Sequence, residues 1–189
     1  MKWRPMERMR WEIESLGGVT VEVLRNMRSE RMVEELRWKG MDLKWKANDI
    51  AIEILLRFQP LARELRFMRA CIEVLHNLYR IARYVKRVSK LCPNCEVTKK
   101  AVKLLIPWIR EDVEGLTGDR KISRNELPYL QEAFEEFNEE ELPSQGLQNS
   151  DDARMLEGTF NHLKHILASP LYYQRGMKTL EGTPILYIT

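Results

Sequence analysis

The sequence predicts an all-α protein of six helices, arranged as two consecutive three-helix units. Apolar residues repeat at intervals of three and four through most of the chain, which is the spacing of amphipathic helices. Good helix formers fill most of the positions between them. Proline and glycine interrupt this pattern at Gly17 and Gly18, at Pro60, at the stretches CPNC, GLTGD and LPSQG, and at Pro170. These interruptions divide the chain into separate helices.

The composition is that of a water-soluble globular protein. The 189 residues suffice for one domain or two small ones, and the chain is 44% hydrophobic and 31% charged. The hydrophobic share argues against a disordered chain, and the charged share argues against a membrane protein. No apolar stretch is long enough to cross a bilayer, and the N-terminus lacks the apolar core of a secretory signal. We therefore expect a cytoplasmic protein.

The first unit is predicted to occupy residues 1–91. A helix is expected over residues 6–28, although Gly17 and Gly18 interrupt it and the stretch VTVEV alternates as a strand does. The second helix spans Glu30 to Phe58, and its apolar side carries Val33, Leu36, Leu43, Ala47, Ile50, Ile54 and Phe58. The third follows Pro60, which suits a first helical turn because its missing N–H has no intrahelical partner there.

Two adjacent apolar stripes mark the third helix. One contains Leu61, Leu65, Met68, Ile72, Leu75, Tyr79 and Ala82, and the other Cys71, Val74, Leu78, Ile81, Val85 and Val88. Together they form a face wide enough to pack against two neighbouring helices. We therefore expect this helix to be the central one of its unit.

The second unit is predicted to occupy residues 92–169. The apolar pattern restarts at Val97, Ala101, Leu104, Leu105 and Trp108, and Pro107 is expected to kink or shorten this helix. Two more helices are expected, from Glu126 to Phe137 and from Ser150 to Ala168. Residues 170–189 are predicted to form an irregular tail or a short extended arm.

Charge divides the chain unevenly. The net charge is +3, but residues 1–90 carry 20 Lys and Arg against 12 Asp and Glu, whereas residues 91–189 carry 11 against 16. This asymmetry is typical of two halves with different partners, or of halves or subunits that attract each other. Ordinary solvated helix faces would give it too.

Residues 52–88, IEILLRFQPLARELRFMRACIEVLHNLYRIARYVKRV, contain a series of short motifs whose spacing needs no gaps. They resemble the PhoU family of phosphate-transport regulators, in which a helix ends near Arg-Gln-Pro and the next opens with Asp-Leu-Arg and continues to Leu-Glu-Arg-Ile-Gly-Asp. The matching positions are Gln59, Pro60, Glu64, Leu65, Arg66, Leu78, Tyr79, Arg80, Ile81, Ala82 and Arg83. The match covers under a quarter of the chain and implies a six-helix PhoU-like bundle.

The resemblance fails at the acidic positions of that last motif. In the family, Glu-x-x-x-Asp places two carboxylates one helical turn apart, where their oxygens can bind a cation. This chain has Tyr79 and Arg83 there, and the equivalent positions of the second half are Asn161 and His165. Arginine cannot ligate a cation, and a neutral phenol ligates one poorly. We therefore expect a packing or docking surface in place of a metal surface.

Two arrangements of Tyr79 and Arg83 are open at this stage. The ring and the guanidinium, one turn apart, could form a cation–π pair. Alternatively, Tyr79 fills the seam between helices while the Arg83 head group extends into solvent.

The clearest short motif outside the resemblance is Cys92-Pro-Asn-Cys95. Two thiolates provide half of a structural zinc site, and Cys71 with the three histidines completes no familiar spacing. Three interpretations remain open: a metal site completed by a second subunit, a disulfide or redox pair, and a turn that begins the next helix.

Three further patterns fall short of a metal site. Glu73 and His76 form Glu-x-x-His, but a di-iron bundle needs a second such pair. The stretch GLTGDRKISRNEL is similar to half of a calcium loop, with Asp119, Ile122, Ser123 and Glu126 in register and too few other ligands. His162 and His165 lack carboxylate or thiolate neighbours in sequence. We predict no cofactor and no catalytic residue.

The resemblance implies a non-enzymatic regulator of phosphate transport or phosphate signalling. Its partner would be a protein, such as a phosphate transporter component or a signalling protein, and the chain would be a homodimer without membrane insertion. The alternative is a nucleic-acid-associated helical module whose basic half, with Arg63, Arg66 and Arg69, contacts phosphates. No base-reading motif accompanies those arginines.

Overall fold

The computed structural model describes residues 4–26, 29–58, 60–91, 96–118, 132, 135–136 and 151–175. All regular structure in these ranges is helical. The main helices are α1 (Arg4–Arg25), α2 (Glu30–Phe58), α3 (Ala62–Leu91), α4 (Glu96–Thr117) and α7 (Asp151–Arg175). The all-α prediction is therefore confirmed.

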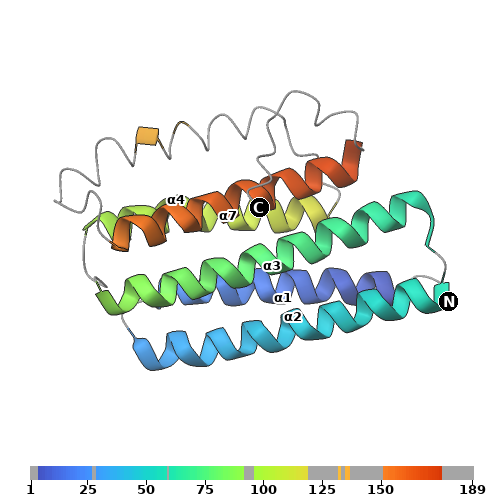
Figure 1. The fold of residues 1–189 in the computed structure, drawn as a ribbon, viewed down its shortest axis with the longest axis horizontal. Coiled ribbons are helices and arrows are strands. Elements are labelled where there is room, and N and C mark those ends of the chain that lie inside the picture. The colour runs from blue at the N-terminus through green and yellow to red at the C-terminus, as the bar shows by residue number, and fades with distance from the viewer. Residues whose placement is uncertain are drawn as a thin grey trace.

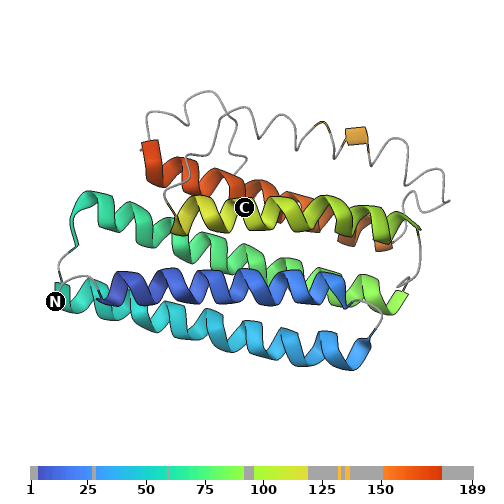
Figure 2. The ribbon, with the colours of Figure 1, turned by 180° about the vertical axis from the view of Figure 1, so that it is seen from behind.

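The five helices run side by side in an elongated bundle (Figures 1 and 2). Helix α3 packs against α1, α2 and α7, and α1 packs against α2, α3 and α4. Helix α3 thus has neighbours on several sides, as its two apolar stripes predict, whereas a central place within a separate unit stays a prediction. Because α3 also packs along α7, the two predicted units share one bundle.

The core lies where the helices face one another. The second predicted stripe of α3 is buried at Cys71, Val74, Leu78, Ile81 and Val85. Matching buried residues are Met9, Ile13 and Leu16 on α1, Leu105 and Ile109 on α4, and Phe160, Leu163 and Ile166 on α7. Burying each large apolar side chain stabilises the fold by about 1.5–3 kcal/mol.

Helix α1 is continuous through the predicted interruption. Val19, Val21 and Val23 are all buried, because neighbouring helices surround α1 on several sides. Their alternating pattern is typical of a strand, but this segment is helical. Gly17 lies where α1 and α4 approach closely: a Cβ placed there would be 2.7 Å from Val113 Cγ2.

The turn between α2 and α3 differs from the prediction in one detail. Pro60 lies just before α3 and not in its first turn. Leu61 occupies the N-cap position, because its carbonyl accepts a hydrogen bond from the Leu65 N–H at 2.9 Å. The Leu61 N–H donates to the Glu64 carboxylate at 2.7 Å, as in a capping box.

Pro107 and Pro170 both lie inside helices. Helix α4 does not end at Pro107, and α7 continues through Pro170 to Arg175. The predicted helix end at Ala168 is therefore wrong. Proline removes one helical hydrogen bond, and packing can offset this cost: Tyr173, beyond the proline, lies edge-on to Phe67 with ring centres 5.1 Å apart.

The helix predicted over residues 126–137 lies almost entirely outside the described residues, and the six-helix count and the division into units remain predictions. Within the described part of the chain, no helix is both long and apolar enough to cross a membrane.

Candidate functional site

One side of α3 faces solvent along the length of the helix. Its exposed side chains follow one another at spacings of four, three and seven residues: Leu65, Arg69, Ile72, His76, Arg83 and Arg87. Such spacing places them on one face of a helix. None of the six is acidic, so this α3 face is apolar and cationic.

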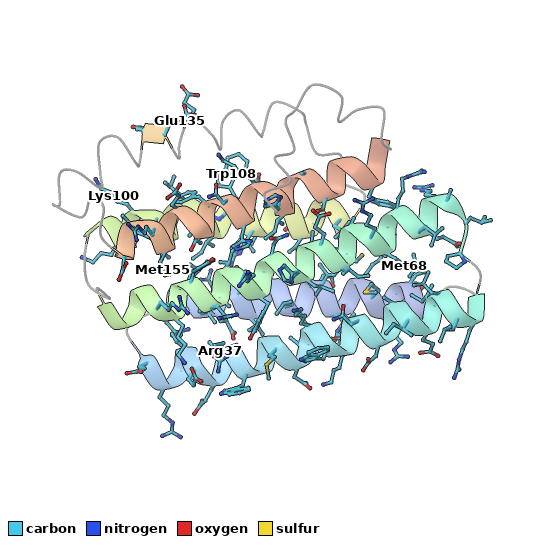
Figure 3. The ribbon with its side chains drawn as sticks, viewed as in Figure 1. Arg37, Met68, Lys100, Trp108, Glu135 and Met155 are labelled. Carbon is cyan, nitrogen blue, oxygen red and sulfur yellow. The ribbon has the colours of Figure 1, made fainter. Side chains whose placement is uncertain are left out.

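A groove of about 680 Å³ lies at the N-terminal end of the α3 face, and its lining comes from α3, α7 and Leu55 of α2. Met68 marks this end of α3 in Figure 3. The apolar lining residues are Leu55, Leu65, Met68 and Ile72, and the polar ones are Arg69, Glu73, His76, Asn77, His162 and His165. The groove is therefore apolar along one part and rich in histidine along another.

Several aliphatic side chains around this groove are unusually exposed. Leu55, Leu65 and Ile72, which line it, are 49%, 43% and 38% exposed, and the nearby Leu56 and Leu61 are 79% and 72% exposed. A cluster of exposed apolar side chains in a soluble protein marks an interaction site.

Leu61, Leu65 and Ile72 belong to a stripe predicted to pack against neighbouring helices, and their exposure corrects that prediction. The signal that could have found them is charge on the same face. Arg69 lies between Leu65 and Ile72 at helical spacing, and His76 follows one turn later.

Hydrogen bonds fix the orientation of His162 at the edge of the groove. Its Nδ1 lies 2.7 Å from Asn77 Oδ1, and Asn77 Nδ2 donates to the Glu73 carbonyl at 2.8 Å. Because the Asn77 oxygen must then accept, His162 Nδ1 carries the hydrogen. The His162 ring also stacks on Tyr84, with ring centres 5.4 Å apart.

The potential around the histidines is positive. Burial, followed by the charge of Arg80, lowers the pKa of His162 to about 4, so this imidazole is neutral near pH 7. Burial, followed by Lys44 and Arg80, also lowers the pKa of His76. Among the residues that line the groove, Glu73 is the single carboxylate. The groove therefore favours negative charge in whatever enters it.

Of the two arrangements left open for Tyr79 and Arg83, at the positions of the PhoU family's acidic pair, the structure favours packing over a cation–π pair. Tyr79 is half-buried in the seam between α2 and α3, where Lys44 Nζ of α2 lies 5.2 Å from the ring centre. Arg37 of α2 also contacts the phenol. Arg83 is exposed. This arrangement matches the packing alternative.

Beside Tyr79, an ion-pair network joins α2 to α3. The Arg37 guanidinium donates two hydrogen bonds to the Glu34 carboxylate, at 2.8 and 3.3 Å, and Lys86 of α3 pairs with the same carboxylate. These hydrogen bonds, that of Arg37 first, lower the pKa of Glu34 to about 2. Tyr79 and the charged residues beside it thus make structural contacts between α2 and α3.

The other positions of the resemblance are mostly structural. Leu78 and Ile81 lie in the core, Arg66 and Arg80 are half-buried, and Glu64 caps α3. Gln59 lies outside the described residues. Leu65 and Arg83 are the two that reach the exposed α3 face.

No metal centre forms among the residues that the structure describes, where no three His, Cys, Asp or Glu side chains are placed to hold an ion. Glu73 and His76 both line the groove, and Asn161 and His165 are half-exposed on α7. Cys71 is buried and free, and burial raises its thiol pKa well above the usual value. Cys92 and Cys95 lie outside the described residues, as do Asp119, Ile122, Ser123 and Glu126 of the calcium-loop-like stretch, whose first residues form the end of α4.

The arginines suggested for phosphate contacts do not form one open surface. Arg63 lies 5.9 Å from the centre of the Tyr173 ring, and Arg66 is half-buried. Arg69 is exposed at the groove. The structure therefore does not favour the nucleic-acid alternative.

Comparison with known proteins bears on the fold. No protein-family model matches the sequence, and no curated protein matches it. The crystal structure of PhoU from Pseudomonas aeruginosa is similar to this chain, with a TM-score of 0.73 over 94% of this chain and 100% of that chain. The chain has a PhoU-like fold. The sequences are 16% identical, so the similarity concerns the fold alone.

Proposed function

We propose that this chain is a non-enzymatic regulator of phosphate transport or phosphate signalling that acts by docking onto another protein. The PhoU-like fold, which extends the resemblance of residues 52–88 to most of the chain, supports this role. The single observation that carries the docking mechanism is the composition of the α3 face. Apolar and cationic side chains occupy it, and Tyr79 and Arg83 stand at the positions of the family's carboxylate pair.

The chemistry of this face favours a protein partner over an ion. Lys44 and Arg37 surround Tyr79, so a bound cation would meet positive charges there. Covering the exposed aliphatic side chains of Leu65 and Ile72 with a partner, in contrast, is favourable in free energy. The partner class is a phosphate transporter component or a signalling protein on the cytoplasmic side of the membrane, and the chain acts as a homodimer.

Deleting the gene tests the role. Phosphate uptake, measured with radiolabelled phosphate at low and high external phosphate, is expected to lose its normal dependence on phosphate supply. A tagged chain purified under native conditions is expected to bring down a transporter or signalling component. Unchanged uptake in the deletion strain, together with no such component in the purified material, contradicts the proposal.

A further inference from the structure

We infer that the groove along α3 and α7 binds an acidic amphipathic helix of the partner protein. This inference rests on the proposed regulatory role and specifies the chemistry of the partner. The partner helix would lay its apolar side on Leu55, Leu65, Met68 and Ile72 and hold its carboxylates against the basic side chains around them.

The dimensions of the groove suit a helix. Its lining on α3 runs from Leu65 to Asn77, a distance of about 18 Å at 1.5 Å per residue. A partner helix of about three turns would cover it. The apolar lining residues Leu65, Met68 and Ile72 recur at three and four, which is the spacing that packs into the grooves of a neighbouring helix.

The apolar surface extends beyond what a small ligand covers. Leu56 and Leu61, at the end of α2 and just before α3, are the most exposed large hydrophobic side chains in the described part of the chain, and Leu61 lines a separate hollow with Phe67 and Tyr173. Ile52, one turn before Leu56, is 54% exposed. Exposed apolar side chains thus continue past the groove residue Leu55 along α2, where a partner helix longer than the groove would meet them.

Charge selects an acidic helix. Arg69 is the cation of the groove lining, and the positive charges of Lys44 and Arg80 act on His76 beside it. Glu73 supplies the single negative charge of the lining. Glutamate and aspartate on the flanks of a docked helix would meet opposite charges, whereas lysine and arginine would be repelled.

Binding of synthetic helices to the full-length chain tests the inference. The probe is a fluorescein-labelled peptide of about five helical turns, with leucine at intervals of three and four and glutamate elsewhere. Its twin carries lysine in place of every glutamate. Fluorescence anisotropy at low ionic strength is expected to show about ten-fold tighter binding of the acidic peptide, or more.

Variants locate the binding surface. Ile72→Glu and Arg69→Glu are each expected to weaken binding of the acidic peptide about ten-fold or more. Met32→Glu and Arg25→Glu are the matched controls, because they place the same acidic residue at exposed positions outside the groove lining. Both controls are expected to bind as the wild type does, and circular dichroism checks that all four variants fold.

Three results would overturn the inference. The first is equal affinity for the acidic peptide and its lysine twin, or binding that Ile72→Glu and Arg69→Glu leave unchanged. The second is a dimer, seen by sedimentation, that Ile72→Glu dissociates, because the occupant is then a second copy of the chain. The third is binding to phosphatidylglycerol vesicles that Ile72→Glu abolishes, because the occupant is then a membrane surface.

Failure of this inference is distinguishable from failure of the proposed function. If Ile72→Glu restores normal phosphate uptake to the deletion strain, the role stands and the groove is not the docking site. If deletion leaves uptake unchanged but the peptides are discriminated as expected, the groove binds acidic helices in a different process.

Discussion

Tyr79 lies at a position where the PhoU family has an acidic residue, but its surroundings are cationic. At this place a carboxylate could bind a cation, whereas the phenol of Tyr79 is contacted by Arg37 and lies under Lys44. The same arginine holds Glu34, which also pairs with Lys86 of α3. The negative charge beside Tyr79 is therefore that of Glu34 on α2, which joins two helices.

Glu34 is expected to make the stability of the fold depend on acid. Its pKa is about 2 in the folded chain and 4.5 when unperturbed, so its contribution is complete above about pH 4.5 and is lost as the pH falls toward 2. Glu34→Gln should lower the free energy of unfolding near neutral pH by about 1 kcal/mol, since the network is partly exposed. Urea unfolding between about pH 6 and pH 2.5 measures this difference, which should shrink with acidification.

Glu35→Gln is the matched control for Glu34→Gln. Glu35 pairs with Arg31, and both side chains are largely exposed. Its replacement should change stability little at any pH. An equal effect of the two substitutions would contradict a special role for the Glu34 network.

His162 is expected to destabilise the fold in mild acid. Its pKa falls from 6.5 to about 4 on folding, so the unfolded chain takes up a proton as the pH drops below 6.5 and the folded chain does not. Stability is therefore lost between about pH 6.5 and pH 4. His162→Gln keeps a donor for Asn77 and removes this titration, so its melting temperature should fall less between about pH 7.5 and pH 5 than that of the wild type.

His165→Gln tests whether that effect belongs to His162. His165 lies nearly one turn away on the same helix and lines the same groove. Its charge is one of the smaller causes of the lowered pKa of His162, so its replacement should flatten the pH dependence of melting less than His162→Gln does. If His165→Gln flattens the dependence as much as His162→Gln does, the assignment to His162 is wrong.

At the scale of single helices, two adjacent glycines of α1 have opposite roles. A Cβ at Gly17 would lie 2.7 Å from Val113 Cγ2, whereas nothing lies within 4 Å of a Cβ at Gly18. Gly17→Ala should lower the free energy of unfolding by about 1–3 kcal/mol through overpacking. Gly18→Ala should raise it by about 0.5–1 kcal/mol, because alanine favours the helix.

Denaturant unfolding of the two glycine variants measures both changes. Gly17→Ala combined with Val113→Ala provides the internal check, because the smaller side chain removes the clash. The double variant should then be less destabilised than the sum of its two single changes. If the two changes in unfolding free energy add exactly, the contact between Gly17 and Val113 does not determine how closely α1 and α4 pack.

The helices were largely predictable because their boundaries depend on local chemistry. Helix α2 has its predicted bounds, Glu30 and Phe58. The failures arose where packing overrides local preference. Val19, Val21 and Val23 have a strand-like pattern, yet α1 is helical because helices surround it. Pro170 signals a helix end, yet α7 continues to Arg175.

The candidate groove was less predictable, because it depends on which apolar residues find a partner. Ile72 and Leu75 belong to one predicted stripe, but Leu75 is 1% exposed and Ile72 is 38% exposed. Periodicity identifies a helix face without identifying how many neighbours cover it. The pairing of His162 with Asn77 joins positions far apart in sequence, and no local pattern reports such a contact.

At the scale of the whole molecule, the fold brings the two oppositely charged halves together. Residues 1–90 carry a net charge of +8 and residues 91–189 one of −5. Helix α3 of the basic half packs along α7 of the acidic half. Helix α7 itself carries three acidic and three basic side chains, so this contact does not pair the two net charges, and Arg69, Arg83 and Arg87 keep the exposed α3 face cationic.

This distribution of charge predicts the metal content of the protein. Lys44, Arg37 and Arg80 lie near the positions of the family's acidic pair, where they disfavour a bound cation. Elemental analysis of chain purified without chelators should find less than about 0.1 equivalents of iron, zinc or manganese. If zinc is found and the double variant Cys92→Ser and Cys95→Ser lacks it, the cysteines bind the ion and the docking mechanism of the α3 face is unaffected. Stoichiometric metal that survives this double change and is lost in Tyr79→Phe would place an ion beside α3, and the docking mechanism would then be wrong.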